Sequence, residues 1–260
     1  MCKTLQRSGV VKANRKLTDT LFLLDIESSD IANDLGPGQF IHVRIPGMDA
    51  HILRRPFSVY RLDRAKGVMT VLYQTVGEGT RHLAALPAPF SVDIIGPVGN
   101  CWEAPDRAQR ILLVAGGVGA APLYIFAEQL VAAGKEVDVV LGAQTKEALV
   151  ALDPYESLLG HEPYCATDDG SWGYHGFCTG VVSELVESKS YDWVACCGPE
   201  PMMKTVADIT LSKDIPTFIS LEKRMACGIG ACLSCVVMTT DGYKRSCVDG
   251  PIFDAAEVVW

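Results

Sequence analysis

Apolar and polar positions alternate in short runs over the first hundred residues, and Gly, Pro and Asp separate the runs. Alternation with a period of two is typical of β-strands that bury one face. Roughly six strands at this spacing, with few helical stretches between them, predict a small antiparallel barrel. The clearest strands are expected at residues 21–26, 39–45, 68–74 and 90–95, with one short helix at residues 79–86.

The pattern changes after residue 100. Residues 110–115 form a continuous apolar run, which is typical of a strand buried in a parallel sheet. Strands and helices then alternate, and this order predicts an α/β domain with a nucleotide site at the carboxyl ends of its strands. Further strands are expected at residues 136–142, 192–197 and 216–221, and helices at residues 121–134, 146–159, 181–188 and 201–212.

The length of 260 residues suits two domains of roughly 100–150 residues and a small appendage. We therefore expect a β-barrel over residues 1–101, an α/β domain over residues 102–219 and a small C-terminal domain over residues 220–260. Hydrophobic residues make up 48% of the chain and charged residues 21%, as in globular proteins with substantial cores.

Charge and hydropathy argue against two kinds of partner. The formal net charge is -8, whereas binding to nucleic-acid phosphates needs a basic surface. No apolar stretch reaches the ~18–20 residues that cross a bilayer. The first residues lead into no apolar segment of a secretory signal, so we expect a cytoplasmic protein with reduced thiols.

Four cysteines near the C-terminus carry the strongest chemical signal. Three follow the spacing Cys-x4-Cys-x2-Cys and a fourth comes later, which is the plant-type spacing for a [2Fe–2S] cluster. Gly228 and Gly230 permit the tight path of a loop that supplies three thiolates. Such a cluster moves one electron at a time, so the chain is expected to carry electrons. The expected ligands are Cys227, Cys232, Cys235 and Cys247.

Structural zinc and disulfide bonds are the alternatives for these cysteines. Zinc sites usually have two separate pairs of close cysteines, whereas three ligands here share one loop. Disulfides are disfavoured because the cytosol keeps thiols reduced. The remaining cysteines, apart from Cys197, are expected to be small buried apolar residues: Cys2, Cys101, Cys165, Cys178 and Cys196.

A glycine-rich turn follows the first expected α/β strand and opens a helix. It contains Gly117, Gly119 and Pro122 in the pattern Gly-x-Gly-x-x-Pro. Glycines at such a turn let the backbone approach a pyrophosphate, and the helix start offers unpaired N–H groups. The strict dinucleotide pattern ends in Gly or Ala, and tight packing of the helix is the alternative explanation.

Two further motifs have weaker signals. Arg55-Pro56-Phe57-Ser58 lies on an expected barrel strand, where Arg can pair with a pyrophosphate and a hydroxyl can bind a flavin edge. Gly79 and Thr80 start the short helix and offer N–H groups to the same phosphates. An ordinary strand and turn are the alternative. Cys197-Gly198-Pro199 ends a parallel strand, where a nicotinamide would reach across the sheet, and packing of a buried cysteine is the alternative.

Taken in order, the motifs resemble those of one family, the electron-transfer subunits of class 1B, NAD-dependent dihydroorotate dehydrogenases. The chain is similar to them in Arg-Pro-Phe-Ser, Gly-Glu-Gly-Thr, Gly-Gly-Val-Gly-x-x-Pro, Cys-Gly-Pro and Cys-x4-Cys-x2-Cys-x11-Cys. The resemblance is most specific at residues 222–232 and 247–253. More broadly, the chain is similar to the ferredoxin–NADP reductase superfamily.

The resemblance implies a division of labour between two subunits. A separate catalytic subunit binds FMN and oxidises dihydroorotate to orotate in pyrimidine biosynthesis. The present chain would take the electrons through its [2Fe–2S] cluster to FAD and reduce NAD. The barrel would bind FAD, the Rossmann-like domain NAD and the C-terminal domain the cluster, in a heterotetramer of two plus two subunits.

The resemblance also implies roles for individual residues. It implies FAD contacts at Arg55, Pro56, Phe57, Ser58, Leu72, Tyr73, Gln74, Gly79 and Thr80. It implies NAD contacts at Gly117, Gly119, Pro122, Cys197, Gly198 and Pro199, with Ser58 and Cys197 near the flavin–nicotinamide junction. No protein general base is expected, because the flavin itself gives a hydride to the nicotinamide. Asp168 and Asp169 would repel a 2′-phosphate, which favours NAD over NADP.

Two other functions compete with this one. The flavin subunit of an NADH-dependent ferredoxin–NADP oxidoreductase, also called sulfide dehydrogenase, has the same three parts, but its cluster is understood to take an Asp for one Cys. A zinc-holding assembly module with a degenerate nucleotide fold would be colourless. We expect Ile229 and Leu233 to seal the cluster loop against the FMN subunit, and Trp260 to serve packing rather than cover the flavin.

Overall fold

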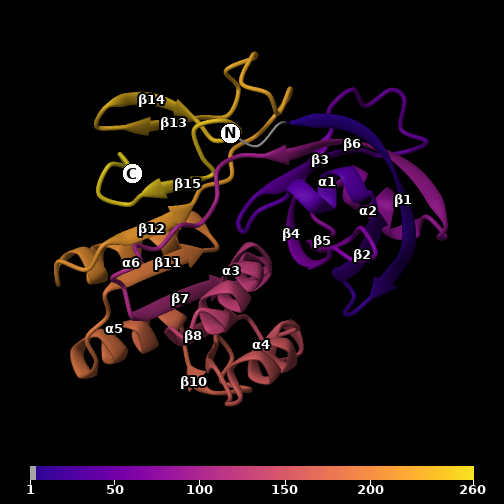
Figure 1. Ribbon diagram of the computed structural model, residues 1–260. Helices are drawn as coiled ribbons and strands as arrows, with labels where there is room; N and C mark the ends of the chain where they lie inside the picture. Colours follow the sequence, from indigo (N-terminus) through magenta and orange to yellow (C-terminus); the bar gives the residue numbers. More distant parts are fainter. Residues whose placement is uncertain (1–3) are drawn as a thin grey trace.

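The computed structural model describes residues 4–260, so Cys2 lies outside the described residues. A barrel and a layered α/β body lie side by side, and the C-terminal segment lies across one end of both (Figure 1). No helix in the described part of the chain is long and apolar enough to cross a membrane.

The first body is a closed antiparallel barrel, as the alternating pattern predicts. Its strands follow one another in the order β1-β2-β5-β4-β3-β6. Side chains such as Leu24, Ile41 and Val71 alternate with outward residues and fill the interior. The barrel elements are β1 (Leu5–Lys16), β2 (Leu21–Glu27), α1 (Ser29–Asp34), β3 (Phe40–Arg44), β4 (Arg55–Asp63), β5 (Val68–Gln74), α2 (Glu78–Ala85) and β6 (Phe90–Val98).

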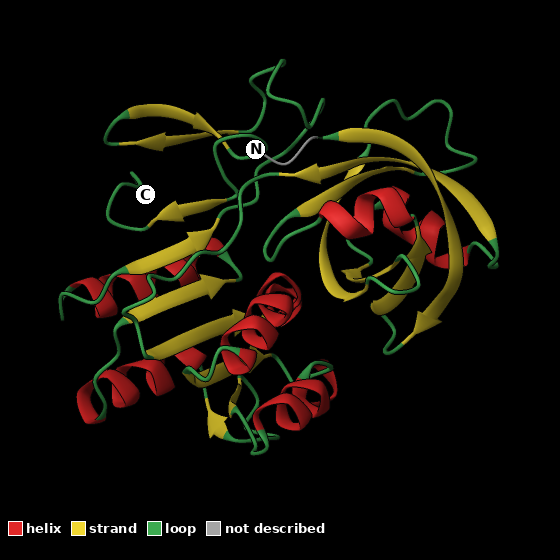
Figure 2. Cartoon of the chain, viewed as in Figure 1, coloured by secondary structure: helices red, strands yellow, loops and turns green. Residues whose placement is uncertain are grey.

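The second body is a Rossmann-like sheet in the order β10-β9-β8-β7-β11-β12-β15. All its pairs are parallel except that of β12 with β15. Helices cover both faces (Figure 2), which explains the continuous apolar strands. The elements are β7 (Arg110–Gly116), η1 (Gly117–Ala120), α3 (Ala121–Ala132), β8 (Glu136–Ala143), η2 (Lys146–Ala148), α4 (Leu152–Leu159), β9 (Tyr164–Thr167), β10 (Tyr174–His175), α5 (Cys178–Ser188), β11 (Trp193–Cys197), α6 (Glu200–Leu211) and β12 (Thr217–Ser220).

The structure corrects one expected helix. Residues 146–159 do not form a continuous helix, because η2 ends at Ala148 and α4 begins only at Leu152. Pro154 explains the break, since proline lacks an N–H and its ring clashes with the preceding turn, so it is tolerated only near a helix start. The short strands β9 and β10 were also not expected as strands.

The C-terminal segment joins both bodies. Strands β13 (Val236–Thr239) and β14 (Gly242–Arg245) form a hairpin, and β15 (Ile252–Asp254) extends the α/β sheet. The chain end stays beside the hairpin, where the backbone N–H of Val259 bonds the carbonyl of Met238. The domain boundaries near residues 102 and 220 remain predictions.

The remaining cysteines and one tryptophan show how the core is arranged. Cys165, Cys178 and Cys196 are buried, as expected, whereas Cys101 is half-buried. Trp102 is buried directly after the barrel, and its indole N–H donates to the carbonyl of Pro122 at 3.0 Å. This bond sets the start of α3 relative to the barrel.

Candidate functional site

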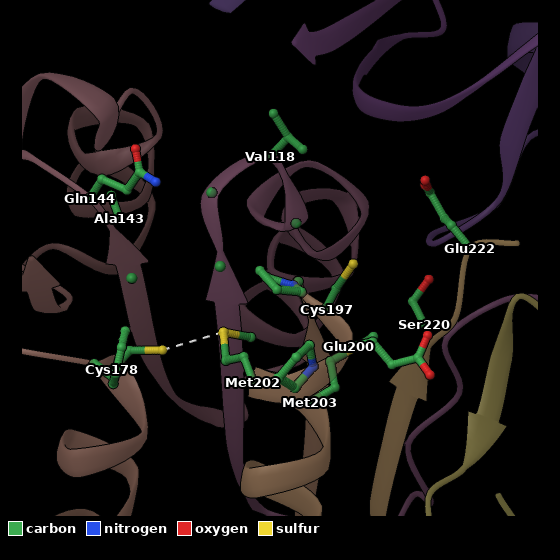
Figure 3. A pocket seen from close by; sticks show the side chains of 18 of the residues that line it. Val118, Ala143, Gln144, Cys178, Cys197, Glu200, Met202, Met203, Ser220 and Glu222 are labelled. Atoms are coloured by element: carbon green, nitrogen blue, oxygen red, sulfur yellow. Dashed lines mark hydrogen bonds between the residues drawn. The ribbon is translucent and has the colours of Figure 1, made fainter. Parts of the chain in front are cut away.

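A cavity of about 660 Å³ opens between the barrel and the carboxyl ends of β7, β8, β11 and β12. This is the edge of an α/β sheet at which nucleotides bind. Ser58 and Gln74 line the cavity from the barrel. Figure 3 shows Gln144 and Ala143 on one side of it and Ser220 and Glu222 on the other.

The glycine-rich turn forms part of the cavity wall. Gly117 has a φ of +56°, which disfavours residues with a side chain, and no atom lies within 4 Å of the position its Cβ would take. Gly119 packs so closely on the end of β11 that an added Cβ would collide with the carbonyl oxygen of Cys197. Both explanations of the motif therefore apply, because Gly117 leaves room for a ligand while Gly119 serves packing. Pro122 also lines the cavity.

Residues 197–199 lie directly beside that turn. A Cβ on Gly198 would lie 3.0 Å from the backbone nitrogen of Gly116, and one on Gly116 would lie 2.6 Å from Sδ of Met202. The structure thus brings together the two segments that the sequence connects with NAD. Nearby, the thiol of Cys178 donates to Sδ of Met202 at 3.4 Å (Figure 3).

Four polar side chains meet on the barrel side of the cavity: Ser58, Cys197, Ser220 and Glu222. The Ser58 hydroxyl donates to Oε1 of Glu222 at 3.2 Å. Burial raises the pKa of the Cys197 thiol, the charge of Glu222 raises it further, and a hydrogen bond with Ser220 opposes the shift. The Cys197 thiol therefore stays protonated and is not a nucleophile. Desolvation raises the pKa of the Glu222 carboxyl, while the Ser58 hydrogen bond lowers it.

Ser220 and Glu222 were missed as site residues. A signal was available, because both lie at the end of an expected parallel strand, where α/β sites gather their polar groups. Nothing in the chain pattern, however, relates Glu222 to Ser58, which comes from the barrel.

The predicted flavin residues of the barrel also meet. The Arg55 guanidinium lies against the start of α2, where a Cβ on Gly79 would lie 2.7 Å from its Nε. The Thr80 hydroxyl is buried and accepts the backbone N–H groups of Val76 and Gly77 at 3.0 and 3.2 Å. Thr80 thus shapes the turn, and the cation of Arg55 lies beside the start of α2, a combination of charges that suits phosphates.

Side chains alternate along β4 and β5, so the other expected flavin contacts are divided between the barrel core and the cavity. Phe57 and Tyr73 point into the barrel core, where their ring centroids are 5.7 Å apart. Ser58 and Gln74 point outward and line the cavity. The buried Leu72 packs with the core of the α/β body. Pro56 pairs with His42 across β3 and β4.

The loop between β12 and β13 carries three of the four expected cluster ligands. Gly228 and Gly230 have φ of +71° and +79°, as a tight path requires, and even Leu233 has a φ of +58°. The backbone N–H of Ile229 lies 3.5 Å from Sγ of Cys227. N–H groups directed at sulfur are typical of iron–sulfur sites.

The four cysteines approach one another as two pairs, Cys227 with Cys232 and Cys235 with Cys247. Although burial opposes it, hydrogen bonds from backbone and thiol lower the pKa of Cys227 to about 7. Burial, followed by the nearby Cys235, raises the pKa of Cys247 to about 12.

Within residues 4–260, no group of three or more His, Cys, Asp or Glu side chains converges on a single ion position. The two cysteine pairs nevertheless supply the four thiolates that a [2Fe–2S] cluster needs for its two irons. The residues present therefore fit this group.

Asp168 and Asp169, which were expected to repel the 2′-phosphate of NADP, differ in position. Asp168 lines the cavity. Asp169 is held in the adjacent turn, where its carboxylate accepts the Ser171 hydroxyl at 2.6 Å and the Ser171 backbone N–H at 3.0 Å. Of the two, only Asp168 lines the cavity.

Comparison with known proteins matches all three parts of the chain. Residues 10–102 match an oxidoreductase FAD-binding domain, and residues 113–208 an oxidoreductase NAD-binding domain. Residues 222–259 match the iron–sulfur cluster binding domain of dihydroorotate dehydrogenase B. The chain is therefore an oxidoreductase with binding domains for FAD, NAD and an iron–sulfur cluster.

Solved structures show the same fold. One from work on the NADH-dependent reduced ferredoxin–NADP oxidoreductase matches with a TM-score of 0.89 and 30% identity, over 97% of this chain and 90% of that one. The ferredoxin reductase of carbazole 1,9a-dioxygenase matches with a TM-score of 0.70 and 22% identity, over 82% of this chain and 67% of that one, and shows the fold alone.

Curated relatives are similar over nearly the full chain. The electron transfer subunit of dihydroorotate dehydrogenase B (NAD(+)) from Bacillus caldolyticus is 38% identical over 96% of both chains. The protein of the same description from Shouchella clausii is 37% identical over 100% of both. With the matching iron–sulfur domain, these similarities show that the chain belongs to the family of dihydroorotate dehydrogenase B electron transfer subunits.

Proposed function

We propose that this chain takes electrons from an FMN-containing catalytic subunit that oxidises dihydroorotate to orotate, and passes them through a [2Fe–2S] cluster and FAD to NAD+ in pyrimidine biosynthesis. One observation carries the proposal. Phe40 of β3 pairs directly with Ser58 of β4. Ser58 lines the nucleotide cavity, whereas Phe40 packs in one small core with Cys235 and Cys247. A single cross-strand pair would therefore separate the flavin from the cluster.

The residues of the chain bind and orient its cofactors. Arg55 and the backbone at Gly79 would hold the FAD pyrophosphate. Gly117 and the turn at Gly198 would frame the nicotinamide nucleotide, with Asp168 toward the ribose. FAD, when bound, converts between one-electron and two-electron transfer.

Two exposed apolar side chains support a partner at the cluster. Ile229 is 57% exposed and Leu233 is 62% exposed, and both belong to the cluster loop. Apolar residues gathered on a surface are typical of protein interfaces. We place the FMN subunit here, in a complex of two plus two subunits, and in the cytoplasm, where the thiols stay reduced.

The test is co-purification of the tagged chain with its catalytic subunit, followed by a spectrum and an assay of NAD+ reduction. We expect an FMN-containing partner, flavin and iron–sulfur absorption, and NADH formation that depends on dihydroorotate. A complex that contains both flavins and iron but produces no NADH from dihydroorotate would contradict the proposal.

The flavin subunit of a ferredoxin–NADP oxidoreductase is a second candidate, because of the structural match with a TM-score of 0.89. A brown-yellow protein that oxidises NADH and reduces ferredoxin, yet ignores dihydroorotate, would favour it. Four cysteine ligands favour the first function, since that relative is expected to have Asp at one position.

A further inference from the structure

His42 is a buried histidine on the outer face of the barrel. Its neighbours Ile41 and Val43 point into the barrel core, so His42 points outward, as Phe40 does. It is nevertheless 0% exposed. The loop between β12 and β13 covers it, because a Cβ on Gly228 would lie 2.6 Å from Nδ1 of His42. Figure 1 shows that loop beside the end of the barrel that carries β3 and β6.

Neither ring nitrogen of His42 has a hydrogen-bond partner in the described chain. Leaving a buried polar group unpaired costs about 1–3 kcal/mol, so such a group calls for a missing partner. A neutral imidazole has one N–H donor and one acceptor.

The surroundings indicate where that partner belongs. Nδ1 of His42 faces Gly228, which directly follows the cluster ligand Cys227. The backbone N–H of Ile229 approaches the Cys227 sulfur from the same loop. The backbone carbonyls of Arg54 and Cys227 lie close enough to the ring to raise its pKa slightly as weak acceptors, but neither meets the geometry of a hydrogen bond with a ring nitrogen. The thiolate and sulfide atoms of an iron–sulfur cluster are hydrogen-bond acceptors.

We propose that His42 is a positioning residue for the [2Fe–2S] cluster, whose imidazole N–H donates a hydrogen bond to a cluster sulfur beside Cys227. The proposal depends on the proposed cluster. The bond would stabilise the reduced cluster, because reduction adds negative charge to the sulfurs. Loss of one such bond is expected to shift the reduction equilibrium about tenfold toward the oxidised cluster, or about 59 mV for one electron.

The first experiment uses the wild-type complex, labelled with 15N only in its histidine rings. Pulsed EPR of the dithionite-reduced cluster should show a 15N coupling. The coupling should vanish in His42→Gln and persist in the control His161→Gln, whose histidine is exposed. A cluster signal without a 15N coupling in the wild-type complex would overturn the inference and leave the proposed function intact. A protein that purifies with FAD but without iron would instead contradict the proposed function.

The second experiment compares His42→Leu, which lacks a donor, with His42→Gln, which keeps one. We expect the cluster potential to fall in His42→Leu and to return most of the way in His42→Gln, with FAD content and NADH-dependent flavin reduction unchanged in both. Equal potentials in wild type and His42→Leu would show that the ring only fills space. Loss of iron from both variants would likewise contradict a hydrogen-bonding role, because the donor failed to rescue it.

Discussion

The hydroxyl of Ser58 donates a hydrogen bond to Oε1 of Glu222 at 3.2 Å and so joins residues 164 positions apart. Ser58 belongs to β4 of the barrel, and Glu222 begins the segment that leads to the cluster loop. The bond lies in the lining of the cavity between the barrel and the α/β sheet. One contact thus connects the expected flavin edge, the end of the α/β sheet and the cluster segment.

We expect Ser58→Ala to slow flavin reduction by NADH about tenfold, the effect of about 1.4 kcal/mol from one lost hydrogen bond. Stopped-flow absorbance of the flavin would measure it. Ser58→Thr, which keeps a hydroxyl, is the matched control. Equal rates in Ser58→Ala and wild type would show that the hydroxyl does not act on the flavin.

Although Glu222 is exposed to solvent as a whole residue, the raised pKa of its carboxyl predicts a small pH dependence of stability. The folded chain holds this proton more tightly than the unfolded chain, whose carboxyl has a pKa of about 4.5. Stability contributed by the group therefore falls as the pH rises from about 4.5 through the higher folded pKa. Glu222→Gln should remove this decline. Its Tm should therefore rise relative to the wild-type Tm as the pH increases across that range. Glu184→Gln, at an exposed site, is the control. A constant Tm difference at every pH would refute the prediction.

Replacing any one cluster ligand by Ser should abolish the iron–sulfur signal and the dihydroorotate-dependent formation of NADH. FAD binding should survive, because the barrel has its own core. We would measure iron, FAD and both activities in Cys232→Ser, with Cys101→Ser as the control. Chelation of iron from the wild-type chain should have the same result. Retention of the dihydroorotate activity without iron would exclude an electron path through the cluster.

Gly119→Ala should destabilise the chain by about 1–3 kcal/mol, because its Cβ collides with the backbone of Cys197. The shift should move Cys197 and Gly198 and raise the KM for NADH. Thermal unfolding and steady-state kinetics would report both effects. Gly134→Ala is the control, because its Cβ meets no atom within 4 Å, although its φ is +73°. A KM unchanged in Gly119→Ala would show that the close packing is unrelated to NADH binding.

Asp168→Ser should raise kcat/KM for NADPH relative to NADH about tenfold, because it removes a charge that repels the 2′-phosphate. Asp169→Asn is the comparison, since that carboxylate holds the Ser171 turn outside the cavity lining. Its coenzyme ratio should stay near the wild-type value. If Asp169→Asn changed the ratio and Asp168→Ser did not, the assignment of the ribose contact would be reversed.

Local patterns were sufficient for most of the architecture. The period-two runs predicted the antiparallel barrel, and continuous apolar strands separated by helices predicted the parallel sheet. A strand buried on one face alternates apolar and polar residues, whereas a strand buried on both faces is apolar throughout. Where a local signal was misread, as at Pro154, a helix was placed too long. The three residues of β15 are too short for a pattern, and their strand is recognised only by its pairing with the distant strand β12.

The order of residues establishes which chemistry is available: four cysteines at cluster spacing, a glycine-rich turn after a buried strand, and an arginine motif on a barrel strand. Which of these groups meet depends on the folded arrangement. It brought Glu222 to Ser58 and buried His42 beneath Gly228. Spacing along the chain reports neighbours within one element, whereas these contacts depend on how the barrel, the sheet and the C-terminal loop pack, and that packing is set by the summed burial of many side chains.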